Sequence, residues 1–309
     1  MLAAHRIMFL ESPLLTAALC LGAIVAGLVA GGVVYLLAWR MTHGSGTLLG
    51  RPRCLSCGQP LSATEMIPLF GWATRRGACA HCGAPIGLAC LVCELLGAGV
   101  FASVLLRYGI GLQALEVLAF ACVLMVASLT SLWDYSVRNS CIATAVVVRL
   151  AYLLALAARG EGVTELALSS LVGAVALGLP LALAVFLSNA MLARDITGWG
   201  TVKLVAVTGL YLGWQQGLLT LAAAFMIGVV VWLVSPTKLL PVEVAGGSEG
   251  PHDGTPAEPR VTPRRLRATH EEDIAEPMRL IPFTPSIAIA CWGMLLLGVG
   301  LAAWSSPLF

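Results

Sequence analysis

The chain has 309 residues, of which 59% are hydrophobic and 11% charged, and its formal net charge is +2. A soluble domain carries roughly 25% charged residues. This composition therefore excludes an ordinary soluble globular protein and indicates an integral membrane protein. The net charge itself says little; we expect membrane lipids around the chain and no nucleic-acid partner.

Apolar runs long enough to cross a bilayer, about 20 residues each, predict the membrane helices in chain order. They are 14–38, 87–106, 110–133, 140–158, 163–188, 215–235 and 280–304. A shorter run, 201–213, makes an eighth span if it is tilted or partly re-entrant. The first run is too long for a signal-peptide core, and no cleavage site stands out after it, so we expect it to be retained. The sequence predicts an all-α polytopic membrane protein of about eight transmembrane helices.

The runs and the loops between them divide the chain into five predicted parts. These are a first transmembrane helix (1–38), a cysteine-containing domain (39–86), a membrane core (87–235), a long loop (236–279) and a last transmembrane helix (280–309). The 236–279 loop is rich in Pro, Gly, Glu and Arg, a composition typical of a flexible linker.

Lysine and arginine in the loops predict the orientation, because cytoplasmic loops carry an excess of both. With the N-terminus outside, the outer segments keep only Arg6, Arg107 and Arg159. The segments that then face the cytoplasm are 39–86, 134–139, 189–200 and 236–279. We therefore expect a multi-pass protein whose cysteine domain and long loop are cytoplasmic.

Two C-x2-C pairs, Cys54 with Cys57 and Cys79 with Cys82, lie in the first long loop, and a glycine follows each pair. Four thiolates in two such turns suit a tetrahedral structural Zn²⁺ site of the ribbon type. Disulfides are uncommon on the reducing side of the membrane, which favours a metal over bridges. An apo thiol cluster is the alternative. We expect His81 to be an exposed neighbour and assign no chemistry to the other cysteines.

Four acids lie in or at the ends of spans, where an ionisable residue is a functional hypothesis. We expect Glu116 to reach the outer interface and Glu94 to be a buried hydrogen-bond anchor. Asp134 and Asp195 both lie at the predicted cytoplasmic face. Two carboxylates at one depth are what an aspartic protease needs, because a shared proton lets one act as base and the other as acid. The alternative for each Asp is an ordinary helix-end residue.

Several segments together resemble the type IV prepilin peptidases, membrane aspartic proteases of the GxGD kind. The cysteine loop is similar in "TEMIPLFGW" and "RRGACAHCGAPI", and Glu94 matches the acid that follows it. The segments "KLVAVTGLYLGW" and "IPFTPSIAIA" also resemble the family. The resemblance implies an eight-helix enzyme of the bacterial inner membrane that cuts the leaders of type IV pilins or pseudopilins at the cytoplasmic face. Many members also methylate the new N-terminus with S-adenosylmethionine.

The resemblance carries the first catalytic position to Asp134 and the second to Thr201. Where the family has GxGD, this chain has Gly198, Gly200 and then Thr201, followed by Lys203. A threonine hydroxyl cannot replace a carboxylate that must ionise near neutral pH. Asp195 aligns with the Glu that precedes the motif, and it could substitute only if a glycine-containing loop folds it back.

The chain departs from the family elsewhere too, with Tyr35 where Asn is expected and Ala89, Cys90 and Leu91 where Arg-Tyr-Pro is usual. The first hypothesis is a prepilin peptidase with atypical or lost proteolysis. The second is an impaired paralogue that serves as a scaffold or substrate-binding component of a pilus or type II secretion system. A methyltransferase without its protease half has no Gly-rich nucleotide loop to support it. A transporter is the weakest alternative, because no internal repeat stands out.

Overall fold

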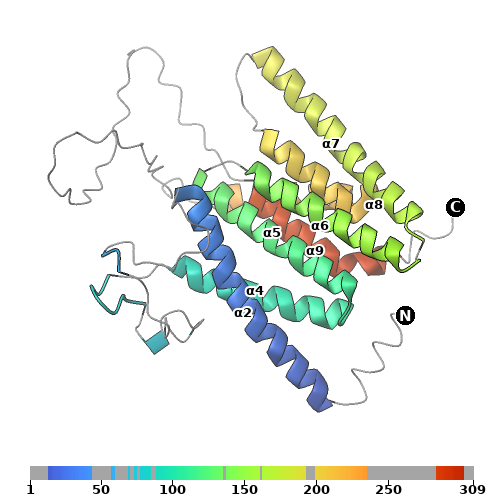
Figure 1. Ribbon diagram of the computed structural model, residues 1–309. Helices are drawn as coiled ribbons and strands as arrows, with labels where there is room; N and C mark the ends of the chain where they lie inside the picture. Colours follow the sequence, from blue (N-terminus) through green and yellow to red (C-terminus); the bar gives the residue numbers. More distant parts are fainter. Residues whose placement is uncertain are drawn as a thin grey trace, which may run out of the picture.

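Seven α-helices form the regular elements of the residues that the computed structural model describes, which are 13–43, 57–59, 69, 73–74, 77–84, 88–134, 137–160, 162–192, 199–234 and 283–302. With the labels of Figure 1, they are α2 (Pro13–His43), α4 (Leu88–Tyr108), α5 (Leu112–Asp134), α6 (Asn139–Ala158), α7 (Thr164–Leu192), α8 (Trp199–Val234) and α9 (Thr284–Ala302).

The predicted fold class, an all-helical membrane protein, is confirmed. Six of these helices, α2 and α4 to α8, are long and apolar enough to cross a membrane, and Thr284–Leu296 of α9 is a shorter apolar helix. Their ends lie close to those of the predicted runs, and the largest extension is at α2, which continues to His43. There Thr42 Oγ1 donates hydrogen bonds to the carbonyls of Ala38 and Trp39.

The helices run up and down the bundle, since short connections join most of them. As a result, the ends of α2 and α5 and the starts of α4, α6 and α8 lie on one side, the left of Figure 1. We call this side the Asp134 end, after the last residue of α5. The structure thus brings together segments that are far apart in the sequence.

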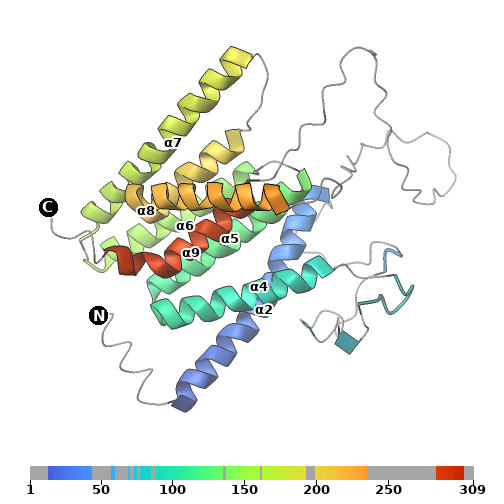
Figure 2. The same cartoon turned by 180° about the vertical axis from the view of Figure 1, so that it is seen from behind.

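A sharp turn at Gly213 divides α8 into two arms. Gly213 has φ 73° and ψ 179°, outside the helical region and accessible at low cost only to glycine. A Cβ on Gly217 would lie 3.6 Å from the Cα of Gly209, whereas eight residues of continuous helix would separate them by about 12 Å. The chain therefore reverses, as the two arms in Figure 2 show. The separate runs 201–213 and 215–235 match these arms; eight membrane crossings stay a prediction.

Glycines allow two pairs of helices to pack with their backbones in contact. A Cβ on Gly31 of α2 would lie 2.7 Å from the Cα of Glu94 in α4, and one on Gly97 would lie 3.0 Å from the Cα of Gly31. A Cβ on Gly173 of α7 would likewise lie 2.7 Å from the Cα of Gly213 in α8. Small residues at such contacts are typical of membrane helices, which gain nothing from removing apolar side chains from lipid.

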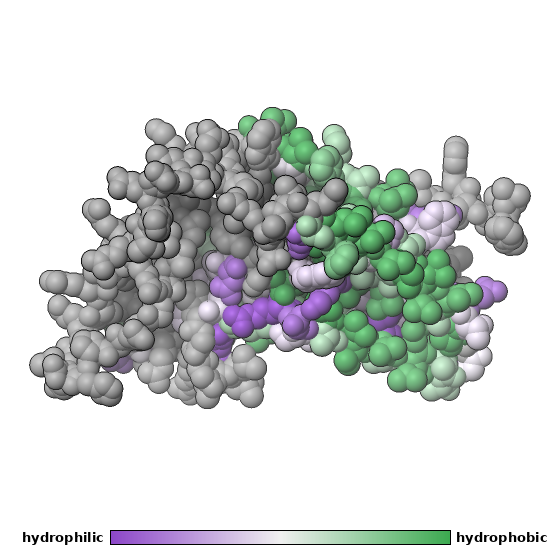
Figure 3. All heavy atoms as spheres, turned by 90° about the horizontal axis from the view of Figure 1, so that it is seen from above, coloured by the Kyte–Doolittle hydropathy of each residue, from purple (hydrophilic) through white to green (hydrophobic). Residues whose placement is uncertain are grey.

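The exposed surface of the helices is apolar. Large side chains such as Leu14, Leu154 and Leu233 are 85%, 70% and 68% exposed, and Figure 3 shows a broad hydrophobic surface over the helices. Buried side chains such as Phe120 and Ile287 form the interior between α5, α6, α8 and α9. An exposed apolar surface of this extent indicates contact with lipid.

We expect Gly31→Ala to destabilise the protein, because the new Cβ would press on the backbone of Cys93 and Glu94. Overpacking of this kind costs roughly 1–3 kcal/mol. The matched control is Gly22→Ala in the same helix, where nothing lies within 4 Å of an added Cβ. Thermal unfolding of the detergent-solubilised protein should show a lower midpoint for Gly31→Ala only. Equal midpoints would contradict the close α2–α4 packing.

Candidate functional site

Asp134 is the last residue of α5 and is partly exposed. Its Oδ2 accepts a hydrogen bond from Nη2 of Arg138, at 3.1 Å, and the two side chains are 32% and 40% exposed. Ion pairs this exposed contribute about 0–1 kcal/mol. The ion pair with Arg138 therefore holds the Asp134 carboxylate only weakly, and this carboxylate can form hydrogen bonds with other groups instead.

The start of α8 contacts the start of α6 at the Asp134 end. Lys203 Nζ donates a hydrogen bond to Oδ1 of Asn139 at 2.9 Å. A Cβ added to Gly200 would lie 3.1 Å from the Cβ of Val137, so glycine permits the close approach of the two segments. These contacts join the segment after Asp134 to the segment that carries the motif position 201.

Thr201 is half-buried and lies directly after Gly200, whose neighbour Val137 follows Asp134 by three residues. The structure thus brings Asp134, Thr201, Gly200 and Lys203 to the same end of the bundle. At position 201 it offers a hydroxyl and no carboxylate. Asp195 and Gly198 lie outside the described residues.

Helix α2 supports the end of α5. The Tyr35 ring meets the Trp133 ring edge-on, with 5.8 Å between the centroids and an angle of 74° between the planes. Buried Val34, Ala38 and Ala127 belong to one small core that connects α2 with α5 and the first turn of α6. This packing holds the residue next to Asp134 in place.

Glu94 is a buried anchor for the segment that carries the cysteines, as expected from the sequence. Its Oε2 accepts a hydrogen bond from the backbone N–H of Leu69 at 2.9 Å. Its Oε1 accepts a weak hydrogen bond from the thiol of Cys90 at 3.7 Å. Gly32 of α2 faces this carboxylate, and an added Cβ would lie 3.5 Å from Oε1, an ordinary contact distance. Leu69 itself has φ 60°, an uncommon value for a residue with a Cβ.

Three of the four predicted metal ligands lie together: the sulfur atoms of Cys57, Cys79 and Cys82 are all within 4.8 Å of one another. Cys54 lies outside the described residues. In the second pair, the Cys79 N–H donates to the carbonyl of Ala84 at 2.9 Å, and the Gly83 N–H donates to the carbonyl of Cys79 at 3.0 Å. This tight turn directs two sulfurs to the same point.

The donor set fits the predicted zinc ion. The glycines after the pairs, Gly58 and Gly83, have φ 69° and 70°, which glycine adopts at no steric cost. Zinc–sulfur bonds of about 2.3 Å bring thiolates into the range that these three sulfurs occupy. His81 is exposed, as predicted. A zinc ion here would cross-link the two cysteine turns and serve a structural purpose.

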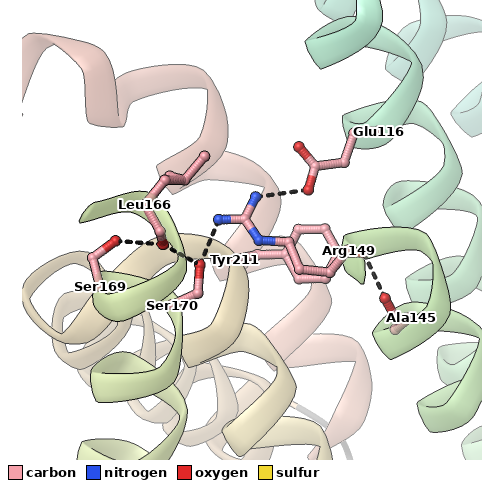
Figure 4. Close-up of polar contacts among 7 residues, drawn as sticks. All are labelled: Glu116, Ala145, Arg149, Leu166, Ser169, Ser170 and Tyr211. Carbon is pink, nitrogen blue, oxygen red and sulfur yellow. Dashed lines mark hydrogen bonds and ion pairs between the residues drawn. The ribbon is translucent and has the colours of Figure 1, made fainter. Parts of the chain in front are cut away.

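The structure corrects the prediction for Glu116. This residue does not reach the interface; it is buried and forms an ion pair with Arg149 of α6, whose Nη1 donates to Oε1 at 2.7 Å. Arg149 Nη2 also donates to Ser170 Oγ of α7 at 2.7 Å (Figure 4). Sequence reasoning missed Arg149 and Ser170. The available signal was one arginine within the apolar 140–158 run. The preceding apolar run, 110–133, contains an acid that could pair with it.

Comparison with known proteins agrees with this architecture. Residues 25–108 match the family model described as the bacterial peptidase A24 N-terminal domain. The chain is 28% identical over 207 residues to the prepilin leader peptidase/N-methyltransferase of Bacillus subtilis, covering 67% of this chain and 77% of the relative. It is 27% identical over 212 residues to that of Myxococcus xanthus, covering 68% and 61%. With that of Aeromonas hydrophila it shares 26% over 257 residues, covering 83% and 75%.

No solved structure matches the chain. The helices and the bacterial relatives define a polytopic bacterial membrane protein with the N-terminal domain of the A24 peptidases. The similarity extends over most of the chain and is repeated in relatives that share one name. These similarities support membership of the prepilin leader peptidase/N-methyltransferase family.

We expect the double variant Cys57→Ser/Cys82→Ser to lose its bound zinc, because it removes one sulfur from each cysteine turn. Metal analysis of the purified protein should give about one zinc per wild-type chain and a background value for the variant. Cys20→Ser is the matched control, since Cys20 lies in α2, away from the cluster. Equal zinc in the three proteins would rule out the site.

Proposed function

We propose that this chain binds the leaders of type IV pilin or pseudopilin precursors at the cytoplasmic face of the bacterial inner membrane and cleaves them slowly. The observation that carries the proposal is the contact of Gly200 with Val137 in the α5–α6 connection, together with the bond of Lys203 to Asn139 at the start of α6. Position 201 directly follows Gly200, so this contact supports a site in which position 201 and Asp134 act together. The names and similarity of the relatives support the substrate class.

The reaction explains why position 201 limits the rate. An aspartic dyad uses one carboxylate to take a proton from water and the other acid to protonate the peptide carbonyl. Asp134 supplies one carboxylate, whose weak bond to Arg138 leaves it available. Thr201 cannot ionise near neutral pH, so position 201 supplies no second carboxylate to share the proton with Asp134.

The rest of the proposal follows the predicted orientation. The cysteine domain would be cytoplasmic and would be stabilised by zinc, and Glu94 would attach it to the membrane part through Leu69. The alternative of a purely scaffolding paralogue differs only in having no turnover. Methyl transfer from S-adenosylmethionine stays a prediction of the family resemblance and forms no part of this proposal.

We expect Thr201→Asp to raise the rate of leader removal from a pilin precursor by about a hundredfold or more, the contribution typical of a positioned acid or base. Thr201→Asn is the matched control, because it has the size of Asp without the acid. Thr201→Asp/Asp134→Ala should return to the low rate. The measurement is precursor processing in isolated membranes, followed by the mass shift of the pilin.

Two outcomes would contradict the proposal. Fast cleavage by the wild type that disappears in both Asp134→Ala and Asp195→Ala would show that Asp195 completes the dyad. No cleavage by Thr201→Asp, together with no leader cross-linking to the wild type, would exclude both catalysis and leader binding at this end.

A further inference from the structure

A polar cluster lies inside the bundle, away from the Asp134 end. Glu116 and Arg149 are only 5% and 6% exposed at their side chains, and Ser170 is buried as well. Nothing in the proposed chemistry uses these residues. An ionised pair within membrane-spanning helices is costly, so its presence calls for a physical reason.

The guanidinium of Arg149 contacts three other helices. It donates to Glu116 of α5 and to Ser170 of α7, both at 2.7 Å, and its Cζ lies 5.4 Å from the ring centroid of Tyr211 in α8. Figure 4 shows the guanidinium between these three partners. One side chain of α6 therefore contacts α5, α7 and α8 at once.

The partners are themselves held in place. Ser170 Oγ donates to the carbonyl of Leu166 at 2.8 Å, which leaves its lone pairs for Arg149. Tyr211 donates its hydroxyl hydrogen to the carbonyl of Ala145 in α6 at 2.8 Å. The ring of Tyr211 stacks on Phe120 of α5, with centroids 3.6 Å apart. The contacts therefore fix both the depth and the rotation of each helix.

Three of the joined helices carry the residues of the Asp134 end. Along α5, Glu116 is about 27 Å from Asp134; along α6, Arg149 is about 15 Å from Asn139; along α8, Tyr211 is about 12 Å from Lys203. A slip of one residue in any helix moves its end by about 1.5 Å. Such a slip breaks hydrogen bonds of 2.7 Å, whereas apolar side chains of adjacent helices can form new contacts after it.

We propose that Arg149 is a positioning residue, which sets the relative register of α5, α6, α7 and α8 and thereby brings Asp134, the Asn139–Lys203 pair and position 201 together. Polar groups in an apolar interior are best attested as devices that select one register. Arginine suits this use, because its rigid planar fork fixes the directions of its donors and stacks on aromatic rings, whereas lysine presents a compact ammonium on a flexible stem. The register proposal rests on the contacts above, and only the statement that the Asp134 end is a catalytic site rests on the proposed function.

The test measures the register directly, by a disulfide between Val137→Cys and Gly200→Cys. A Cβ at 200 would lie 3.1 Å from that of Val137, and a shift of a few tenths of an ångström brings the two atoms into the range of about 3.5–4.5 Å that disulfides need. A protease site inserted between Gly160 and Gly162 of the full-length protein cuts the chain between the two cysteines. Fragments that stay joined until the disulfide is reduced indicate correct register. The variants that carry only one of the two introduced cysteines give the background level of cross-linking.

The chain offers a matched set of serine variants. Ser170→Ala removes the hydroxyl that Arg149 contacts, and Ser170→Thr keeps it. Ser169→Ala removes the adjacent exposed hydroxyl, which bonds to the same Leu166 carbonyl without touching Arg149. We expect the rate of cross-linking to fall about tenfold in Ser170→Ala, the size of effect of a lost hydrogen bond to a charged group. Ser169→Ala and Ser170→Thr should match the wild type.

The double variant Glu116→Leu/Arg149→Leu separates register from stability, because apolar replacement of a buried pair is often neutral for folding. We expect it to accumulate in membranes and to lose cross-linking. Normal cross-linking in this variant, or in Ser170→Ala, would overturn the proposal. If the double variant does not accumulate, the result for Ser170→Ala decides alone. In either variant, reduced accumulation with unchanged cross-linking would mean that the cluster stabilises the protein without setting the register.

Cleavage gives an independent reading. In the Thr201→Asp protein, Ser170→Ala should lower kcat with little change in KM, because the leader still binds while the acids are displaced. A loss of cross-linking in a protein that never cleaves would leave the register proposal intact and refute only the proposed function.

Discussion

Close contact between helix backbones is the constraint on which the rest of this bundle depends. Apolar side chains gain little by leaving lipid for protein, so helices must gain from packing instead. Gly31 and Gly97 bring α2 against α4, and Gly173 and Gly209 bring α7 against α8. These contacts hold the helices beside α5 and α6 together in pairs.

Buried polar groups then add what glycine contacts cannot supply. Glycine contacts bring the backbones together, whereas a hydrogen bond to a charged group also has a specific direction. Glu94 uses such a bond to fasten Leu69 to α4. Arg149 uses two of them inside the bundle. Both side chains are buried by protein while the outer surfaces of their helices are apolar. The cost of removing a charge from water therefore arises only where protein groups can bind that charge.

Much of this arrangement could be predicted from the sequence, because bilayer thickness sets the length of an apolar run and cysteine spacing sets the shape of a metal turn. Three of the four expected zinc ligands lie together for that reason. The Glu116–Arg149 pair could not be predicted, since it depends on which faces α5 and α6 turn toward each other. The approach of Gly200 to Val137 likewise joins segments that no local pattern relates. The identity of position 201, by contrast, is visible only through the family resemblance.

The turn at Gly213 has a consequence for the lipid around the protein. The arm before it, residues 199–212, is about 21 Å long, less than the roughly 30 Å of hydrocarbon in a bilayer. Non-helical backbone at that depth persists only where protein covers it. Gly173 of α7 lies against Gly213, so α7 covers one side of this opened stretch of backbone. The glycine contact between α7 and α8 therefore also reduces the exposure of the turn to acyl chains.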